Sequence, residues 1–201
     1  MKLRYSTTSP YARKCWVVAI ETGLEDRIEF LVTNAWSPET DLPKDNPLCK
    51  VPALITDGGE VLFDSPVICE YLDSLHGGQA LLPASGGARW AQLRLAALAD
   101  GILDAALVKR LELTMRPEDK RWSNWIDRQS AAINRALDVM EEECAAWGGD
   151  FLMGHIAAAV ALGYLDLRFA AEDWRKGRNR LAAWYAVVQQ RPSMVKSFPS
   201  E

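Results

Sequence analysis

One short segment near the start of the chain combines a hydroxyl with the beginning of a helix. Ser9 stands directly before Pro10, and apolar residues then recur at spacings of three and four. Proline suits the first helical turn because its missing N–H is not needed there, and serine is a favoured N-cap. Free N–H groups and the positive end of the helix dipole favour an anion at this position. The sequence alone leaves a thiolate and a phosphate equally suitable.

The cysteines are a second candidate for chemistry. Cys15, Cys49, Cys69 and Cys144 contain no CxxC pair, and the chain has only two histidines. We therefore expect no metal site and reduced thiols that fill apolar positions. The dipole effect on a thiol is strongest in the first helical turn, and Cys15 lies beyond that turn.

Composition limits the possible partners and locations. The chain has 201 residues, 49% hydrophobic and 25% charged, with a net charge of -4. No basic block is present to neutralise phosphates, so we expect no nucleic-acid partner. The longest apolar run, in residues 156–165, is too short to span a bilayer, and no secretory signal is visible. We expect a cytoplasmic protein that does not enter a membrane.

The first part of the chain alternates between strand and helix patterns. Periodicity predicts strands at 2–5, 28–32, 50–55 and 60–63, and helices at 10–22 and 67–76. The sequence Asp-Gly-Gly at 57–59 predicts a hairpin between the last two strands. Two strands joined through a helix favour parallel pairing, so the order predicts an α/β unit with a mixed sheet.

Almost everything after a connector at residues 79–86 has a helical pattern. A long helix runs from Trp90 towards Met115, and a second carries an apolar stripe from Trp122 to Met140. Residues 156–169 are apolar nearly all round and predict a buried central helix. The predicted domains are therefore 1–78 and 87–201, joined by 79–86.

Val51-Pro52 is unusual inside an apolar run. Proline cannot donate a ladder hydrogen bond, so it must lie at a sheet edge or at the first residue of a strand. A cis bond here would expose the Val51 backbone to a ligand. Cis X-Pro bonds are rare, about 5–6%, and the residues alone do not support one.

Four segments together resemble the bacterial serine-type glutathione S-transferases. They are residues 9–14 (SPYARK), 46–54 (NPLCKVPAL), 64–72 (DSPVICEYL) and 161–169 (ALGYLDLRF), in the order and spacing of that family. The resemblance implies a thioredoxin-like α/β N-terminal domain followed by an all-α helical-bundle domain.

The resemblance also implies roles for residues around the glutathione sulfur. Ser9 matches the serine whose hydroxyl donates a hydrogen bond to the glutathione thiolate, and Thr8 is the alternative hydroxyl. Val51 matches the residue whose backbone pairs with the cysteinyl part of glutathione, and Pro52 is expected to be cis.

Further residues match the ends of the tripeptide. Asp64 and Ser65 match the acidic-serine pair that holds the γ-glutamyl group, whereas a helix cap is the simpler reading of Ser65. Lys50 is placed to meet the glycyl carboxylate, although an exposed loop lysine would look the same.

The implied activity is conjugation of glutathione, as co-substrate, to a small hydrophobic electrophile, as in detoxification. The electrophile pocket is expected between the domains, with Tyr11, Trp36, Met115 and Trp122 as candidate lining residues. The helical domain is expected to form a homodimer. A glutathione-binding protein with little transferase activity remains an alternative, as does a peroxidase, although a thiol reductase would want cysteine at position 9.

One segment departs from the family pattern. The buried helix of the family usually begins with Ser/Thr-x-x-Asp, a capping box, but this chain has Leu152 and His155 there. Leucine cannot cap a helix. We expect Asp150 to cap instead, with an earlier helix start.

Overall fold

The computed structural model describes residues 1–199, which form two compact units. Residues 1–84 together with 191–199 form an α/β unit, and residues 85–190 form a helical unit. The α/β unit contains β1 (Lys2–Tyr5), α1 (Pro10–Glu21), β2 (Glu29–Val32), β3 (Ala53–Ile55), β4 (Val61–Leu62), α2 (Ser65–Asp73) and α7 (Pro192–Lys196), with 3-10 turns at Glu25–Arg27 and Leu42–Lys44. The helical unit contains α3 (Gly86–Thr114), α4 (Ser123–Glu143), α5 (Met153–Phe169) and α6 (Asn179–Val188), with 3-10 turns at Glu118–Lys120, Cys144–Ala146 and Ala170–Glu172.

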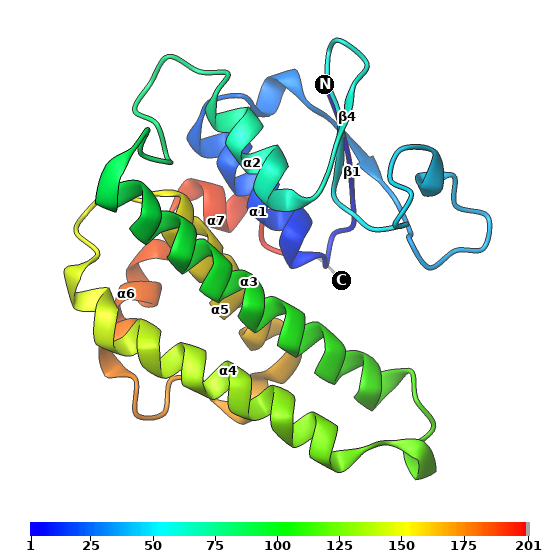
Figure 1. The fold of residues 1–201 in the computed structure, drawn as a ribbon, viewed down its shortest axis with the longest axis vertical. Coiled ribbons are helices and arrows are strands. Elements are labelled where there is room, and N and C mark those ends of the chain that lie inside the picture. Colours follow the sequence, from blue (N-terminus) through cyan, green and yellow to red (C-terminus); the bar gives the residue numbers. More distant parts are fainter. Residues whose placement is uncertain (200–201) are drawn as a thin grey trace. The chain divides into compact units, whose positions relative to one another are not determined.

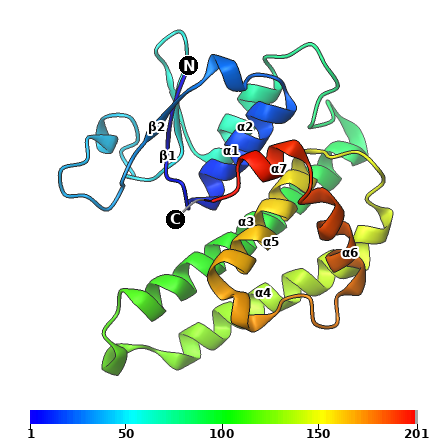
Figure 2. The ribbon, with the colours of Figure 1, turned by 180° about the vertical axis from the view of Figure 1, so that it is seen from behind.

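The sheet is mixed, as the sequence predicted. Its strand order is β2-β1-β3-β4, with β1 parallel to β2 and antiparallel to β3, and β3 antiparallel to β4. Leu3 and Leu54 are opposite one another in the register and fully buried. Helices α1 and α2 pack side by side over one face of the sheet, while the loop after β2 lies on the other side (Figures 1 and 2).

Strand directions decide where the two helices begin. β1 and β4 run in the same direction because each is antiparallel to β3. A helix that follows a strand runs back across the sheet, so α1 and α2 both begin at the edge where β1 and β4 end. β3 runs the opposite way, and therefore starts at this same edge.

The helical unit is organised around α5. Residues 153–165 of this helix are all buried, whereas residues 166–169, which the sequence also predicted to be buried, are half-buried. Ile133, Leu137 and Met140 form the buried face of α4, but Trp122 at the start of the predicted stripe is 62% exposed. No helix within residues 1–199 is long and apolar enough to cross a membrane.

The start of α5 corrects the expectation for its cap. Leu152 occupies the N-cap position, so the helix does not begin earlier and the Asp150 side chain does not cap it. Instead, the Gln92 side chain of α3 accepts a hydrogen bond from the Gly154 N–H at 2.9 Å. Leucine carries no acceptor, and the family's local cap is replaced by one from a neighbouring helix.

His155 makes a different contact from the one that a capping box provides. Its Nδ1 lies 2.7 Å from the Asp150 carbonyl oxygen and 3.3 Å from the Leu152 nitrogen. A carbonyl only accepts, so the shorter contact requires a proton on Nδ1, and this nitrogen cannot then accept from Leu152. His155 thus fastens the preceding loop to the helix.

The end of the chain packs with the α/β unit, which differs from the predicted 87–201 helical domain. Arg191 and Ser193 both donate to the Glu21 carboxylate at the end of α1. Met194 is 1% exposed, and its carbonyl accepts from Arg13 at 2.9 Å. This segment is too short for a helical pattern to reveal which unit it joins.

Candidate functional site

Three of the predicted segments meet at one edge of the sheet in the α/β unit. Ser9 follows β1, Val51 and Pro52 precede β3, and Ser65 follows β4. The strand directions described above bring all three to the edge where β1 and β4 end. Ser9, which is more than forty positions from both Val51 and Ser65 in sequence, therefore lies at the same edge as they do. Their roles toward a ligand stay predictions.

Ser9 lies at the N-cap of α1, as expected. Its Oγ accepts a hydrogen bond from the Ala12 N–H at 3.3 Å, a long distance for an N–H···O contact. Because the oxygen acts only as acceptor here, the hydroxyl hydrogen can still be donated to another group. Capping and donation are compatible at Ser9. Thr8 is half-buried in the preceding turn.

The Val51–Pro52 peptide bond is cis, as the resemblance implied. Val51 is half-buried and Lys50 is exposed at the surface. The loop before them contains Cys49, whose φ of 52° lies in the left-handed region. Cys49 is the one non-glycine residue within 1–199 whose φ lies in this region.

Ser65 does not cap α2, which corrects the simpler reading of this position. Asp64 is the N-cap residue and is exposed, while Ser65 is the first helical residue. Ser65 is 1% exposed, and its hydroxyl has no hydrogen-bond partner within residues 1–199. A buried hydroxyl without a partner costs about 1–3 kcal/mol. Such a group at a helix N-terminus is suited to a bound carboxylate after rotation about χ1.

The four predicted pocket residues are divided between the units. Tyr11 and Trp36 belong to the α/β unit, whereas Met115 and Trp122 flank the connection between α3 and α4. Trp36, Met115 and Trp122 are each more than 60% exposed. Trp122 stacks on Trp125 with ring centroids 6.2 Å apart. The prediction of a shared pocket remains a prediction.

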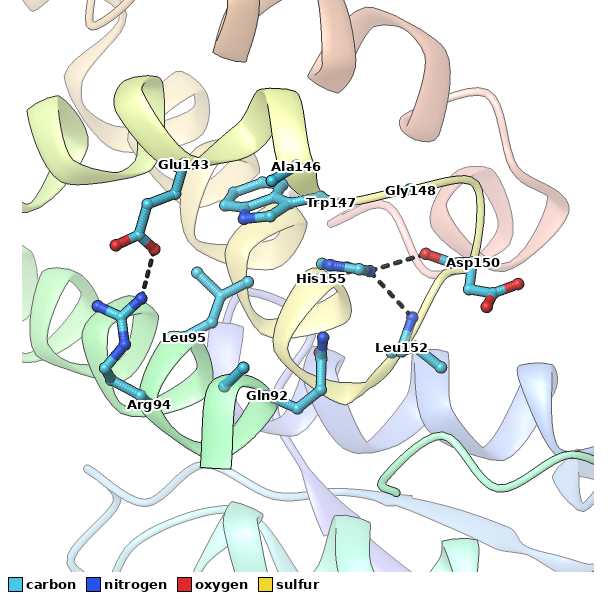
Figure 3. Close-up of a pocket in the computed structure, with 11 residues that line it drawn as sticks. Gln92, Arg94, Leu95, Glu143, Ala146, Trp147, Gly148, Asp150, Leu152 and His155 are labelled. Carbon is cyan, nitrogen blue, oxygen red and sulfur yellow. Dashed lines mark hydrogen bonds and ion pairs between the residues drawn. The ribbon is translucent and has the colours of Figure 1, made fainter. Parts of the chain in front are cut away.

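A cavity of about 470 Å³ lies within the helical unit (Figure 3). Arg94 and Glu143 form an ion pair on one side, and His155 contacts the Asp150 carbonyl on the other. The cavity lies where α3, the end of α4 and the start of α5 meet, and it contains none of the predicted site residues. Arg94 and Glu143 pair with each other, and the Gln92 side chain accepts from the Gly154 N–H.

Sequence reasoning missed a role for one buried polar residue near the predicted site. Asn46 is 1% exposed, and its side chain makes two hydrogen bonds within the loop that leads to Val51. The sequence Asn-Pro is a turn signal that could have indicated the bond from the Leu48 N–H to Asn46 Oδ1. The bond from Asn46 Nδ2 to the Lys50 carbonyl depends on the path of the loop and has no sequence signal.

Comparison with known proteins decides the family. Residues 8–75 match the model of the glutathione S-transferase N-terminal domain, and residues 123–186 match that of the C-terminal domain. The chain belongs to the glutathione S-transferase family. Its mixed four-stranded α/β unit and helical unit are the two parts of that family's fold.

Similar proteins cover the whole of this family member. It is 35% identical to the GST-like protein YibF of Escherichia coli K12, over 99% of this chain and 98% of YibF. It is 45% identical to a glutathione transferase family member from Pseudomonas fluorescens Pf-5, solved with bound glutathione, with a TM-score of 0.95. That match covers 100% of this chain and 99% of the other. A second Pseudomonas structure, with bound S-(propanoic acid)-glutathione, is 44% identical over 100% of both chains with a TM-score of 0.92.

Proposed function

We propose that this protein is a glutathione transferase that conjugates the glutathione thiolate to a small hydrophobic electrophile. The observation that carries the proposal is the arrangement of three segments at one sheet edge. Two helix N-termini, with Ser9 and Ser65, begin where the Val51–Pro52 backbone enters β3. Such an arrangement suits a ligand with one thiolate, one carboxylate and a peptide backbone between them.

The proposed chemistry begins with the thiol. The Ser9 hydroxyl donates a hydrogen bond to the glutathione sulfur, and the α1 N-terminus adds its positive dipole. Both favour the thiolate and lower the thiol pKa from about 8.5 towards neutrality. The thiolate attacks the electrophilic carbon to form the S–C bond. In a substitution, the leaving group departs with the electron pair of the bond that breaks. In an addition, the product takes up a proton.

The rest of glutathione is assigned to the flanking residues. The exposed Asp64 carboxylate faces the γ-glutamyl ammonium, and the Ser65 N–H and hydroxyl receive the γ-glutamyl carboxylate. Lys50 meets the glycyl carboxylate. The Val51 backbone pairs with the cysteinyl residue.

Similar proteins support the ligand and leave the electrophile to experiment. The Pseudomonas relatives bind glutathione and S-(propanoic acid)-glutathione, which supports glutathione as the co-substrate here. We propose that the protein forms a homodimer. We also propose that the electrophile contacts hydrophobic residues, with four candidates: Tyr11, Trp36, Met115 and Trp122. We place the protein in the cytoplasm, because all four cysteines are free thiols.

The first prediction tests Ser9. We expect Ser9→Ala to lower kcat/KM about 10- to 100-fold at pH 7 with glutathione and a chloro-nitroaromatic acceptor, because the thiolate loses a hydrogen bond. The rate should recover as pH rises towards 9, where the thiol ionises without help. Thr8→Val is the matched control, and it should keep most of the activity. A Ser9→Ala enzyme as fast as wild type, or a larger loss in Thr8→Val, would contradict the assignment.

The alternatives predict different results. A glutathione-binding protein would bind glutathione in calorimetry but show no turnover across a panel of electrophiles. A peroxidase would consume glutathione with an organic hydroperoxide and leave the chloro-nitroaromatic acceptor unchanged.

A further inference from the structure

Asn46 occupies the centre of the loop that leads to Val51. Its own backbone N–H donates to the Leu42 carbonyl at 2.8 Å, and its backbone carbonyl accepts from Cys49 at 2.8 Å. The Oδ1 atom accepts from the Leu48 N–H at 3.0 Å, and Nδ2 donates to the Lys50 carbonyl at 2.8 Å. The residue is 1% exposed. Both its backbone and its side chain are thus held inside the loop.

The frame around this loop is fixed by β1. Arg4 donates to Asp41 at 2.9 and 3.1 Å and to Asp45 at 2.8 Å, just before Asn46. The same Arg4 is paired with Ala53 in the sheet register, just after Pro52. One residue of β1 therefore holds both ends of the segment 46–52. The path between those ends depends on the bonds made by Asn46.

The bond from Asn46 to the Lys50 carbonyl also sets the direction of the next N–H. The Lys50–Val51 bond is trans, so the Lys50 carbonyl oxygen and the Val51 N–H point in opposite directions from one peptide plane. With the oxygen held by Asn46 Nδ2, the Val51 N–H must point away from Asn46 and from the interior of the loop. A free carbonyl would allow this plane to rotate.

We infer that Asn46 is a positioning residue that orients the Val51 backbone for glutathione. The inference rests on the proposed function, because Val51 contacts glutathione only if glutathione is the ligand. Asn46 itself touches neither the ligand nor the reacting sulfur. It pre-organises a peptide group that would otherwise be ordered only when the ligand binds.

Two substitutions isolate the bond to Lys50. Asn46→Asp keeps an oxygen that can accept from Leu48 but replaces the donor with a second oxygen, which repels the Lys50 carbonyl. Asn46→Ser keeps a shorter acceptor for the turn, carries no charge, and cannot reach Lys50. Asn34→Asp is the matched control, because Asn34 Oδ1 accepts from Trp36 and an aspartate keeps that bond while adding the same charge.

The first measurement is glutathione affinity by calorimetry, scaled to the folded fraction seen by circular dichroism. We expect a five- to tenfold rise in Kd for Asn46→Asp and Asn46→Ser, with Asn34→Asp close to wild type. In steady-state assays the KM for glutathione should rise by a similar factor, while kcat at saturating glutathione stays within about twofold. Wild-type affinity in Asn46→Ser would overturn the inference, as would an equal loss in Asn34→Asp.

A second measurement separates this inference from the proposed function. In the ligand-free protein, the Val51 amide signal in a ¹H–¹⁵N NMR spectrum should shift and broaden in both Asn46 variants but not in Asn34→Asp. If wild type binds no glutathione, the proposed function fails and the ligand part of the inference fails with it. An unchanged Val51 amide would overturn the positioning role even if glutathione binds to wild type.

Discussion

At the scale of single residues, Cys49 adopts a backbone conformation that residues with a Cβ atom disfavour. Cys49 has a φ of 52°, where a Cβ atom meets the following carbonyl. Its Sγ lies 3.6 Å from the Ala35 carbonyl, a weak contact. This cysteine directly precedes Lys50 and Val51, so the strain lies within the proposed glutathione loop.

The second prediction follows from this strain. We expect Cys49→Gly to raise the free energy of unfolding by about 0.5–1 kcal/mol, since glycine adopts positive φ without steric cost. Cys49→Ala keeps the Cβ and should give no gain. Urea unfolding of the three proteins measures the difference. An equal gain in both variants would show that the thiol, not the Cβ, is responsible.

Ser65 shows how a structure changes the interpretation of one residue. The sequence favoured a capping serine, because Pro66 follows it. In the fold Asp64 takes the N-cap position, and the buried Ser65 hydroxyl is left without a partner within residues 1–199. A buried hydroxyl without a partner is suited to a hydrogen bond with a ligand, whereas a hydroxyl that caps a helix already has its partner.

At the scale of elements, α3 and α5 approach closely at Gly154. A Cβ built there would lie 2.7 Å from Gln92 Oε1 and 2.8 Å from the Gln92 backbone oxygen. Both distances are too short for real contacts, and the Gln92 cap of Gly154 would be displaced as well. The close approach explains how a side chain from α3 can cap α5.

The third prediction compares two helical glycines. Gly154→Ala should lower the free energy of unfolding by about 2 kcal/mol or more, because the clash adds to the lost cap. Gly101→Ala in α3 should raise it by about 0.5–1 kcal/mol, since nothing lies within 4 Å of its added Cβ. Thermal unfolding measures both. A fall in Gly101→Ala would indicate that a second copy packs on that face, as the proposed homodimer allows.

His155, which contacts the loop that precedes α5, is buried. Burial lowers the pKa of His155, and the contact with the Asp150 carbonyl and the nearby Asp150 charge only partly oppose this effect. The side chain is therefore neutral in the folded protein at pH 7. In the unfolded chain its pKa is about 6.5.

The fourth prediction concerns pH. The unfolded state takes up a proton more readily than the folded state, so stability is full above pH 6.5 and falls as pH drops below it. We expect His155 to contribute a loss of up to about 1.4 kcal/mol between pH 7.5 and 5.5. Urea unfolding at several pH values, compared with His155→Gln, isolates this contribution. Identical pH profiles would contradict the prediction.

At the scale of the whole molecule, residues 191–196 hold the C-terminal end of α1 and the 3-10 turn that follows it. Arg191 and Ser193 donate to Glu21, and Lys196 donates to Glu25 at 2.6 Å. Burial would raise the pKa of Glu21, but the hydrogen bonds from Arg191 and Ser193 outweigh it and lower the pKa. The carboxylate is thus stabilised in its charged form by the end of the chain.

The fifth prediction tests this attachment. Glu21→Gln should lower the free energy of unfolding by about 1–3 kcal/mol, because charged hydrogen bonds are lost. The contribution of Glu21 is present above about pH 4.5 and is lost as pH falls through the lowered folded pKa. Hydrogen exchange should be faster in residues 192–196. Glu143→Gln, in a more exposed pair with Arg94, is the control and should change stability little.

The sequence determined the parts that depend on local patterns. Period-2 and helical spacing predicted the strands and helices, and the Asp-Gly-Gly hairpin and the apolar run at 156–165 were placed correctly. These features are decided by residues close together in the chain, where propensity and periodicity act. Each of the four motifs that carry the family resemblance is also a continuous stretch of sequence, and the family models confirm the resemblance.

Only the tertiary structure decided which distant residues meet. The Gln92 cap of Gly154 and the hydrogen bonds from Arg191 and Ser193 to Glu21 join groups that are far apart in sequence. The bond from Asn46 to the Lys50 carbonyl is closer in sequence, but it forms only because the loop follows one path. Each depends on strand order, helix approach or the path of a loop, and these are set by the packing of the core as a whole. For the same reason, the sequence could name Ser9 and Ser65 as helix-terminal serines, but it could not show that both helices begin at one edge.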